Sequence, residues 1–191
     1  MTPKEKTRRR ILKTAGKMLL ANGYNGFSYR DIAEEVGIRK ASIHYHFPSK
    51  AELGAAIVRN YHEWLIRWAE EMDTKHDTCF ARLDAFFKLY RDFFGVGEKI
   101  CMNGVLSANL NGLPEEMKEE FRKLLRFEHA WMKRVIKEGQ ESGEFKSDQS
   151  PGKLALLIGA AMQGAIQIAR ANDRMDLLDV SIDQMKIVLT G

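Results

Sequence analysis

The stretch GFSYRDIAEEVGIRKASIHYHFPSKAEL, residues 26–53, decides the fold. Ser28 can cap a first short helix, and Gly37 can end it after about two turns, since glycine tolerates a left-handed turn. A second short helix is expected over 40–47, and Ser49 can cap a longer one. Two short helices joined by a tight turn that contains glycine predict a helix-turn-helix. The apolar positions expected in its core are Ile32, Val36, Ile38, Ile43 and Phe47.

Charge is distributed unevenly along the chain, although the net charge is only +4. Residues 1–60 contain 12 Lys or Arg and 5 Asp or Glu, a balance of +7, whereas residues 61–191 contain 18 and 21, a balance of −3. This asymmetry indicates that the first part meets a polyanion, because cations there attract phosphates and release counterions. The cations around the predicted helix-turn-helix are Lys4, Lys6, Arg8, Arg9, Arg10, Lys13, Lys17, Arg30, Arg39, Lys40 and Lys50.

Nearly all of the remaining chain is typical of helix, so we expect an all-α fold of about nine helices. Pro3 suits the first position of the first helix, with Thr2 as its cap and Glu5 completing a capping box. A long fourth helix is expected to begin near residue 50, and the natural domain boundary lies there, between 1–50 and 51–191. The later helices are expected at about 77–95, 100–111, 114–142, 151–172 and 176–189.

Several classes of protein are disfavoured. No segment approaches the ~20 apolar residues of a membrane span, and no secretion signal follows the basic start. Cys79 and Cys101 make no disulfide framework, which favours a reducing cytoplasm. His44 and His46 lie about 200° apart around a helix, so they do not share a metal ion. We expect no metal, no cofactor and no enzymatic activity.

Residues 26–53 closely resemble the N-terminal domain of TetR-family transcriptional repressors. The shared features are the capped second helix, the aromatic-rich third helix and the FPSK start of the fourth. The resemblance implies a homodimer that inserts the helix 40–47 of each subunit into the major groove of a near-palindromic double-stranded DNA operator. The DNA contacts that it implies are Ser28, Tyr29, Arg30, Arg39, Lys40, Ala41, Ser42, His44, Tyr45, His46 and Lys50, the last as a phosphate anchor.

Two positions depart from the family pattern. Arg39 stands where Ser or Thr is common, so the third helix loses its usual cap and Arg39 can contact a phosphate instead. His44 stands where Tyr is usual, and a protonatable ring there would make DNA affinity mildly dependent on pH. His44→Tyr is therefore expected to keep binding and to change its pH dependence.

Aromatic and methionine side chains are dense after residue 80, a pattern typical either of a plain core or of an adaptable apolar pocket. The resemblance implies the pocket, which would make 51–191 an effector-binding and dimerisation domain. We call the helix expected over 40–47 the reading helix. A small apolar or aromatic effector would favour a dimer in which the reading helices of the two subunits are spaced wrongly for DNA. The residues expected to line the pocket are Phe86, Tyr90, Cys101, Met102, Phe121, Phe127, Trp131 and Gln163.

The segment LALLIGAAMQGAIQIA, residues 154–169, is apolar almost all round and rich in small residues. Such a helix needs a neighbour on both sides, and one of them can be a second subunit. Together with the last helix it predicts a two-fold dimer through a four-helix bundle. The residues expected at this interface are Leu157, Ala161, Ala165, Ile168, Leu178, Ile182 and Met185.

Cys101 leaves an alternative switch open. It lies near the start of a predicted helix beside Lys99, a setting that favours a reactive thiolate, and its segment is similar to one in TetR-like regulators that sense electrophiles or oxidants. The other interpretation is a small buried hydrophobe. A Cys-based enzyme using Cys101 and His129 is a remote alternative, because nothing supplies a third orienting group or an oxyanion hole.

Overall fold

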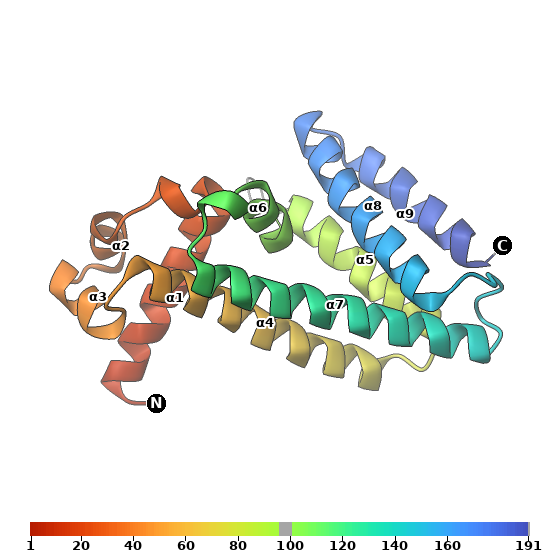
Figure 1. Cartoon of the computed structure of the whole chain (residues 1–191), viewed down its shortest axis with the longest axis horizontal. Helices are drawn as coiled ribbons and strands as arrows, with labels where there is room; N and C mark the ends of the chain where they lie inside the picture. The colour runs from red at the N-terminus through yellow and green to blue at the C-terminus, as the bar shows by residue number, and fades with distance from the viewer. Residues whose placement is uncertain (96–100, 191) are drawn as a thin grey trace. The chain divides into compact units, whose positions relative to one another are not determined.

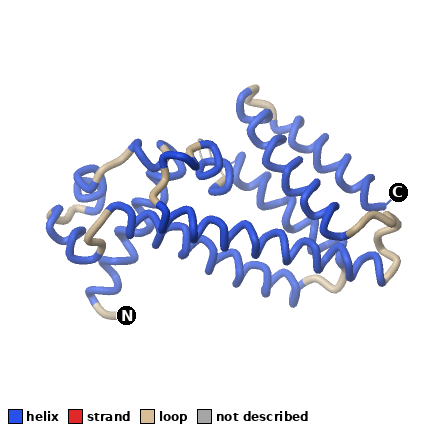
Figure 2. Tube along the Cα trace, viewed as in Figure 1, coloured by secondary structure: helices blue, strands red, loops and turns tan. Residues whose placement is uncertain are grey.

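The computed structural model describes residues 1–95 and 101–190, and every regular element in these ranges is helical (Figures 1 and 2). The predicted all-α class is confirmed. The elements are α1 (Pro3–Asn22), η1 (Tyr24–Gly26), α2 (Tyr29–Val36), α3 (Lys40–His46), α4 (Lys50–Lys75), α5 (Cys79–Gly95), α6 (Met102–Ala108), η2 (Leu110–Gly112), α7 (Glu115–Glu141), α8 (Pro151–Ala171) and α9 (Met175–Thr190).

α6 is shorter than the predicted helix over 100–111. It stops at Ala108 and is followed by the 3₁₀ turn η2. The Asn109 side-chain amide donates to the carbonyl of Val105 at 3.0 Å, where the next backbone N–H of a continuing helix would donate. A side chain thus satisfies the carbonyl, and the chain is free to turn.

The chain packs as two compact units. Unit 1 is Met1–Glu63 with Lys99–Leu124, and unit 2 is Trp64–Glu98 with Leu125–Gly191. These units do not follow the boundary expected between residues 50 and 51. The long helices α4 and α7 each contribute one end to each unit, and the boundary between 1–50 and 51–191 stays a prediction.

Local capping explains how unit 1 begins. Thr2 and Glu5 form the predicted capping box at the start of α1, and Ser28 and Asp31 form a second box at the start of α2. Gly37 ends α2 in the left-handed conformation with φ of 70°, where its N–H reaches back to the carbonyls of the last turn. Three residues separate α2 from α3, and the two helices make the predicted helix-turn-helix.

α6, η2 and the start of α7 complete the core of unit 1. Gly54 on α4 lies in a close approach, because a Cβ there would meet Met117 Sδ at 2.9 Å and Tyr24 Cε2 at 3.1 Å. The buried carboxylate of Glu120 accepts hydrogen bonds from Arg59 at 3.0 Å and from Lys123 at 2.9 Å. Residues more than fifty positions from the helix-turn-helix therefore form part of its support.

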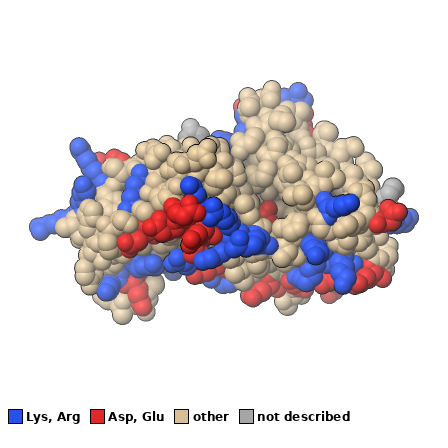
Figure 3. All heavy atoms as spheres, viewed as in Figure 1, with Lys and Arg blue, Asp and Glu red and all other residues tan. Residues whose placement is uncertain are grey.

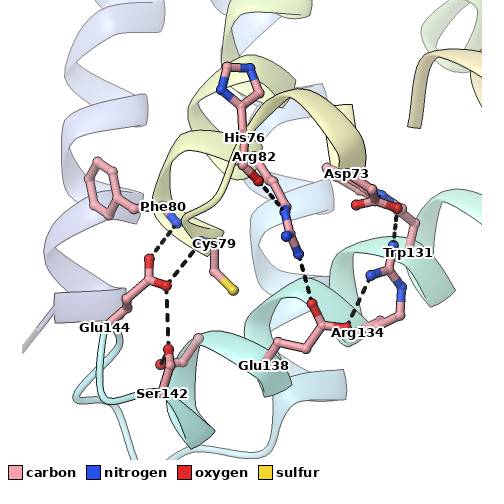
Figure 4. Close-up of polar contacts among 11 residues, drawn as sticks. Asp73, His76, Cys79, Phe80, Arg82, Trp131, Arg134, Glu138, Ser142 and Glu144 are labelled. Atoms are coloured by element: carbon pink, nitrogen blue, oxygen red, sulfur yellow. Dashed lines mark hydrogen bonds and ion pairs between the residues drawn. The ribbon is translucent and has the colours of Figure 1, made fainter. Parts of the chain in front are cut away.

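Unit 2 is an antiparallel set of helices in which α8 and α9 lie side by side (Figure 1). Glu144, in the connection after α7, accepts hydrogen bonds from the backbone N–H groups of Cys79 and Phe80 at 3.1 and 3.0 Å (Figure 4). It thereby caps the start of α5 from 64 residues away. On α9, Lys186 bonds Asp84 at 2.5 Å, one turn further along α5.

α8 is long and apolar enough, by length and composition, to cross a membrane, with a mean hydropathy of 1.4. The prediction that no segment approaches a span is wrong on this point. Central helices of water-soluble proteins pass the same test, and Leu154, Ile158 and Met162 are fully buried in the core of unit 2. Other apolar α8 side chains, among them Leu156 and Ile168, are exposed.

Candidate DNA-binding surface and effector region

α3 is held to unit 1 by one face and presents the other to solvent. Ile43 and Phe47 are buried, as predicted, whereas Lys40, Ala41, His44 and Tyr45 are exposed, and Ser42 and His46 are half-buried. In Figure 3, Lys and Arg side chains project from the end of unit 1 that carries α2 and α3. This exposed face has the width and the charge that suit a major groove.

Tyr29 does not belong to that exposed face. Its side chain is 6% exposed, and its hydroxyl donates to the carbonyl of Phe47 at 2.8 Å. Burial raises the pKa of Tyr29 to about 12, and electrostatic effects of Glu52 and Tyr24 act in the same direction. The prediction that Tyr29 contacts DNA is therefore wrong for its hydroxyl, which joins the start of α2 to the end of α3.

Lys50 is likewise used inside the unit. Its ammonium donates to the carbonyl of Phe27 at 2.5 Å and lies 4.7 Å from the ring centroid of Tyr24. Burial lowers the pKa of Lys50, against the opposing effect of Asp31. Lys50 is half-buried, and one of the three N–H donors of its ammonium is used within the unit, so its role as a phosphate anchor stays a prediction.

Arg10 also has an internal partner. Its guanidinium donates to the carbonyl of Val36 at 2.6 Å, in the last turn of α2. A cation at a helix C-terminus satisfies an otherwise unpaired carbonyl and complements the helix dipole. One of the cations that the sequence assigned to phosphate attraction thus holds α1 to α2.

Ser28 and Arg30 are exposed at the start of α2. The Ser28 hydroxyl donates to Asp31 and also accepts from the backbone N–H of Arg30, and this hydrogen bond with Asp31 lowers the pKa of the Asp31 carboxyl. Arg30 pairs with Glu34 at 3.0 Å. Both residues lie where the sequence predicted a backbone contact, and the exposed pair leaves Arg30 able to exchange partners.

The turn between α2 and α3 forms a hollow of about 440 Å³. Arg39 is the N-cap residue of α3 and makes no side-chain cap hydrogen bond, as its departure from the family pattern predicted. With Lys40 it brings two exposed cations to the first turn of the reading helix. The hollow is lined by Arg30, Ala33, Glu34, Gly37, Ile38, Arg39 and Lys40.

The two histidines of α3 have different surroundings. The His44 ring meets Tyr29 edge-on, with 4.7 Å between centroids, and its Nδ1 lies 3.4 Å from the Pro48 carbonyl. His46 is partly buried, and this burial, followed by the positive charges of Lys4 and Arg8, lowers the pKa of His46. Lys4 and Arg8 are therefore close to the end of the reading helix.

Four of the residues predicted to line an effector pocket meet in unit 2. The Phe86 ring lies 5.3 Å from that of Tyr90 and 6.1 Å from that of Trp131. The side-chain amide of Gln163 donates to the Tyr90 hydroxyl at 3.0 Å. These side chains combine an apolar wall with one hydroxyl and one amide, the composition of a site for a small apolar molecule.

Trp131 also borders a second feature, a groove of about 360 Å³ along α4 and α7. The indole N–H donates to Asp73 at 3.2 Å, and Arg134 pairs with the same carboxylate (Figure 4). Phe127, another predicted pocket residue, lines this groove. The remaining three, Cys101, Met102 and Phe121, are buried in unit 1.

The structure gives neither cysteine the surroundings of an exposed thiolate. Cys101 is 3% exposed and is the N-cap residue of α6, while Lys99, its expected neighbour, lies outside the described residues. Cys79 is buried, and that burial, with the charge of Glu144, raises the pKa of its thiol. Its backbone N–H donates to Glu144 at 3.1 Å, an interaction that the sequence did not reveal.

The predicted interface residues fall into two groups. Ala165, Leu178 and Ile182 are buried within the subunit, so the prediction that they meet a partner is wrong. Leu157 and Ile168 are 44% and 58% exposed, and Ala161 and Met185 are half-buried. The large apolar side chains that α8 and α9 leave exposed are Leu156, Leu157, Ile168, Val180 and Ile187.

A capped helix-turn-helix with a basic exposed face, followed by a second helical unit, defines a DNA-binding transcriptional regulator. Comparison with known proteins makes this assignment specific. Residues 11–57 match the domain family described as bacterial regulatory proteins, tetR family, and residues 79–185 match the tetracyclin repressor-like C-terminal domain. The second match alone covers more than half of the 191 residues, and the protein belongs to the TetR family of transcriptional regulators.

Similar proteins extend over most of the chain. The transcriptional repressor DhaR of Mycobacterium sp. strain GP1 is 28% identical over 177 residues, 90% of this chain and 86% of DhaR. The transcriptional regulator AcuR of Cereibacter sphaeroides is 24% identical over 176 residues, 88% of this chain and 78% of AcuR.

Solved structures show the same fold. A TetR-family regulator from Agrobacterium tumefaciens superposes with a TM-score of 0.93 at 27% identity, covering 98% of this chain and all of that one. The reduced form of E. coli NemR gives a TM-score of 0.89 at 21% identity, over 97% of this chain and 98% of NemR, and shows the shared fold alone.

Proposed function

We propose that this regulator is a homodimeric repressor that binds a near-palindromic operator and is released by a small apolar or aromatic effector. The observation that carries the proposal is the exposed face of α3, with Lys40, His44 and Tyr45 presented beside Arg30 and Arg39. The similarity to DhaR, a transcriptional repressor, supports the sign of regulation. Such a protein acts in the cytoplasm, where the bacterial chromosome lies, and needs no catalytic step.

α3 is the element that enters the major groove. Its first turn carries Arg39 and Lys40 toward phosphates, and its exposed middle carries His44 and Tyr45 toward base edges. Tyr29, Lys50 and Arg10 hold the module rigid behind it, through three hydrogen bonds to backbone carbonyls. A reading helix fixed in this way keeps its orientation when it binds, so that less conformational entropy is lost.

The exposed row on α8 supplies the contact between subunits. Leu157, Ala161, Gly164 and Ile168 follow one another at spacings of three and four residues, so they lie along one face of the helix. Leu157 and Ile168 are large, apolar and exposed, whereas the two between them are small. A second copy of α8 can approach closely along such a face and bury it.

The effector would bind beside Phe86, Tyr90, Trp131 and Gln163. Gln163 and Tyr90 already share a hydrogen bond, and a ligand with one polar group can exchange with it while its apolar body contacts the rings. Regulation requires only that the effector binds more tightly to the dimer whose α3 helices are spaced wrongly for DNA.

DNA binding is tested by titrating the purified protein against its own upstream DNA over a range of salt concentrations. We expect steep salt dependence and preference for one short near-palindrome over scrambled DNA. Lys40→Met is expected to lower the slope of log affinity against log salt by about 0.9, the contribution of one phosphate. Lys153→Met, a change of the same kind at an exposed site on α8, is the control and leaves the slope unchanged. Weak, sequence-independent binding of the wild type refutes the function.

Effector binding is tested by thermal shift with a panel of small aromatic and aliphatic compounds. We expect active compounds to raise the melting temperature and to release operator DNA. Gln163→Leu is expected to abolish both effects, whereas Gln167→Leu, an exposed change one turn further along α8, preserves them. Compounds that act equally on both variants would place the effector elsewhere.

A further inference from the structure

Tyr45 on α3 is 69% exposed, yet its ring has close neighbours on two sides. The ammonium of Lys4 lies 4.9 Å from the ring centroid, over its face. The His46 ring lies 5.2 Å away at an interplanar angle of 76°, an edge contact. An aromatic side chain in contact with a cation and a second ring occupies fewer orientations than a free one.

The start of α1 places Lys4 at this position. Thr2 donates its backbone N–H to the Glu5 carboxylate at 2.7 Å, while its hydroxyl accepts from the backbone N–H of Glu5 at 3.2 Å. This capping box fixes the first turn of the helix, in which Lys4 lies. The first turn of α1 is therefore ordered by its own sequence, independently of DNA.

One turn further along the same face of α1, Arg8 repeats the arrangement. Its guanidinium lies 5.0 Å from the centroid of the Phe47 ring, directly after α3. Residues four apart share a helix face, so Lys4 and Arg8 together run along the C-terminal end of the reading helix. Lys6 lies about 200° around the helix from Lys4 and faces another direction.

We propose that Lys4 is a positioning residue for operator recognition, which holds Tyr45 in one orientation so that Tyr45 discriminates the operator from other DNA. The proposal rests on the proposed DNA-binding function. A ring ordered before binding loses less rotamer freedom when it meets a base edge. A cation that only contacts a phosphate would strengthen binding to all sequences equally.

The test is a double-mutant cycle between Lys4→Met and Tyr45→Leu, measured on operator and on scrambled DNA at one salt concentration. We expect Lys4→Met to weaken operator binding more than Lys6→Met does, by about two- to fivefold, the range of an exposed cation–π contact. This excess is expected to vanish on scrambled DNA and in the Tyr45→Leu background. Lys4→Arg and Tyr45→Phe, which keep the cation and the ring face, are expected to retain the wild-type preference.

Additive effects of the two changes, or an equal loss on scrambled DNA, would assign Lys4 to a simple phosphate contact and overturn the proposal. A measurement without DNA separates this failure from a failure of the proposed function. Ring-current shifts of the Lys4 ε-methylene protons in the free protein are expected to persist in Tyr45→Phe and to disappear in Tyr45→Leu. Unshifted protons in the wild type overturn the proposal even if operator binding is found, whereas absent operator binding refutes the function.

Discussion

At the scale of single residues, the hydroxyl of Tyr29 is a small group with a defined task. It satisfies the Phe47 carbonyl, which follows the last residue of α3, from the first residue of α2. The ring itself is buried and packs edge-on against His44, so removal of the hydroxyl alone leaves these contacts to the ring. Tyr29 therefore offers a way to separate stability of the module from contact with DNA.

We expect Tyr29→Phe to lower the free energy of unfolding by about 1 kcal/mol, because a buried carbonyl loses its hydrogen bond. Urea unfolding measures this, with Tyr45→Phe as the same chemical change at an exposed site. The salt slope of DNA binding is expected to be unchanged, since no phosphate contact is lost. A reduced slope with unchanged stability would return Tyr29 to the DNA-contacting set.

We expect His46 to make the stability of the helix-turn-helix depend on pH. Its folded-state pKa is lowered by burial and then by Lys4 and Arg8, so the unfolded chain takes up a proton first as the solution is acidified. The contribution of neutral His46 to the free energy of unfolding is fully present above its unfolded pKa of about 6.5. It is lost as pH falls through the lower folded pKa.

We expect the urea midpoint of the wild type to fall between about pH 7.5 and pH 5.5 by more than that of His46→Gln, which has no ring to protonate. Lys4→Met removes one of the neighbouring charges and is expected to give an intermediate loss. Equal pH dependence in the wild type and His46→Gln would show that His46 takes no part.

At the scale of elements, the start of α5 depends on a residue from another part of the chain. Glu144 reaches the N–H groups of Cys79 and Phe80 and accepts from Ser142 as well (Figure 4). Burial raises the pKa of Glu144, but the hydrogen bonds from these donors outweigh it, and the net shift is downward. The carboxylate form is thus bound into the fold.

We expect Glu144→Gln to destabilise unit 2 by about 1–2 kcal/mol at neutral pH, the typical value of a lost helix cap. Because the folded pKa is depressed, this contribution is present above the unfolded pKa of about 4.3 and is lost as pH falls through the folded value. Denaturation at pH 7 and at about pH 3 is therefore expected to show a difference that shrinks on acidification. Glu141→Gln, at an exposed carboxylate that pairs with Lys137 one turn away, is the control.

The same elements show why some features could be predicted from the sequence. The boxes at Thr2 and Ser28 involve residues three apart, and the turn at Gly37 depends on the conformation of one residue, so local pattern was sufficient. The partners of Tyr29 and Lys50 are 18 and 23 residues away. No local pattern shows that a tyrosine or lysine will be turned inward to such a carbonyl.

The interface on α8 was only partly predictable for a different reason. A helix that is apolar all round carries few polar residues to mark its solvent side, so the pattern does not show which side faces the core. Leu157 and Ile168 are exposed, and their place at an interface stays a prediction, whereas Ala165 fills the interior. The pocket prediction was limited in the same way, because core and pocket use the same aromatic side chains.

At the scale of the whole molecule, the exposed apolar face is the feature that most needs a partner. We expect Leu157→Lys combined with Ile168→Lys to convert a dimer into monomers and to weaken operator binding strongly, because one subunit reads only one half-site. Light scattering after size-exclusion chromatography measures the mass. Leu125→Lys, at a 39% exposed leucine on α7, is the control and keeps the dimer.

If α8 instead met a membrane, the wild type would sediment with lipid vesicles and the double lysine variant would not. We expect no such binding and an unchanged mass of the wild type in the presence of vesicles. Vesicle binding by the wild type would contradict the dimer assigned to this face.

The discontinuity of unit 1 has a consequence in time. Its core is shared between Met1–Glu63 and Lys99–Leu124. The ribosome therefore synthesises the helix-turn-helix before it synthesises the second segment, which packs against the first. At about 5–20 residues per second, the 61 residues from 63 to 124 take roughly 3–12 s to synthesise. For that interval a nascent chain exposes the apolar surface around Gly54 and Tyr24, which Met117 later covers. A regulator built in this order completes its DNA-binding unit only after 124 of its 191 residues have been made.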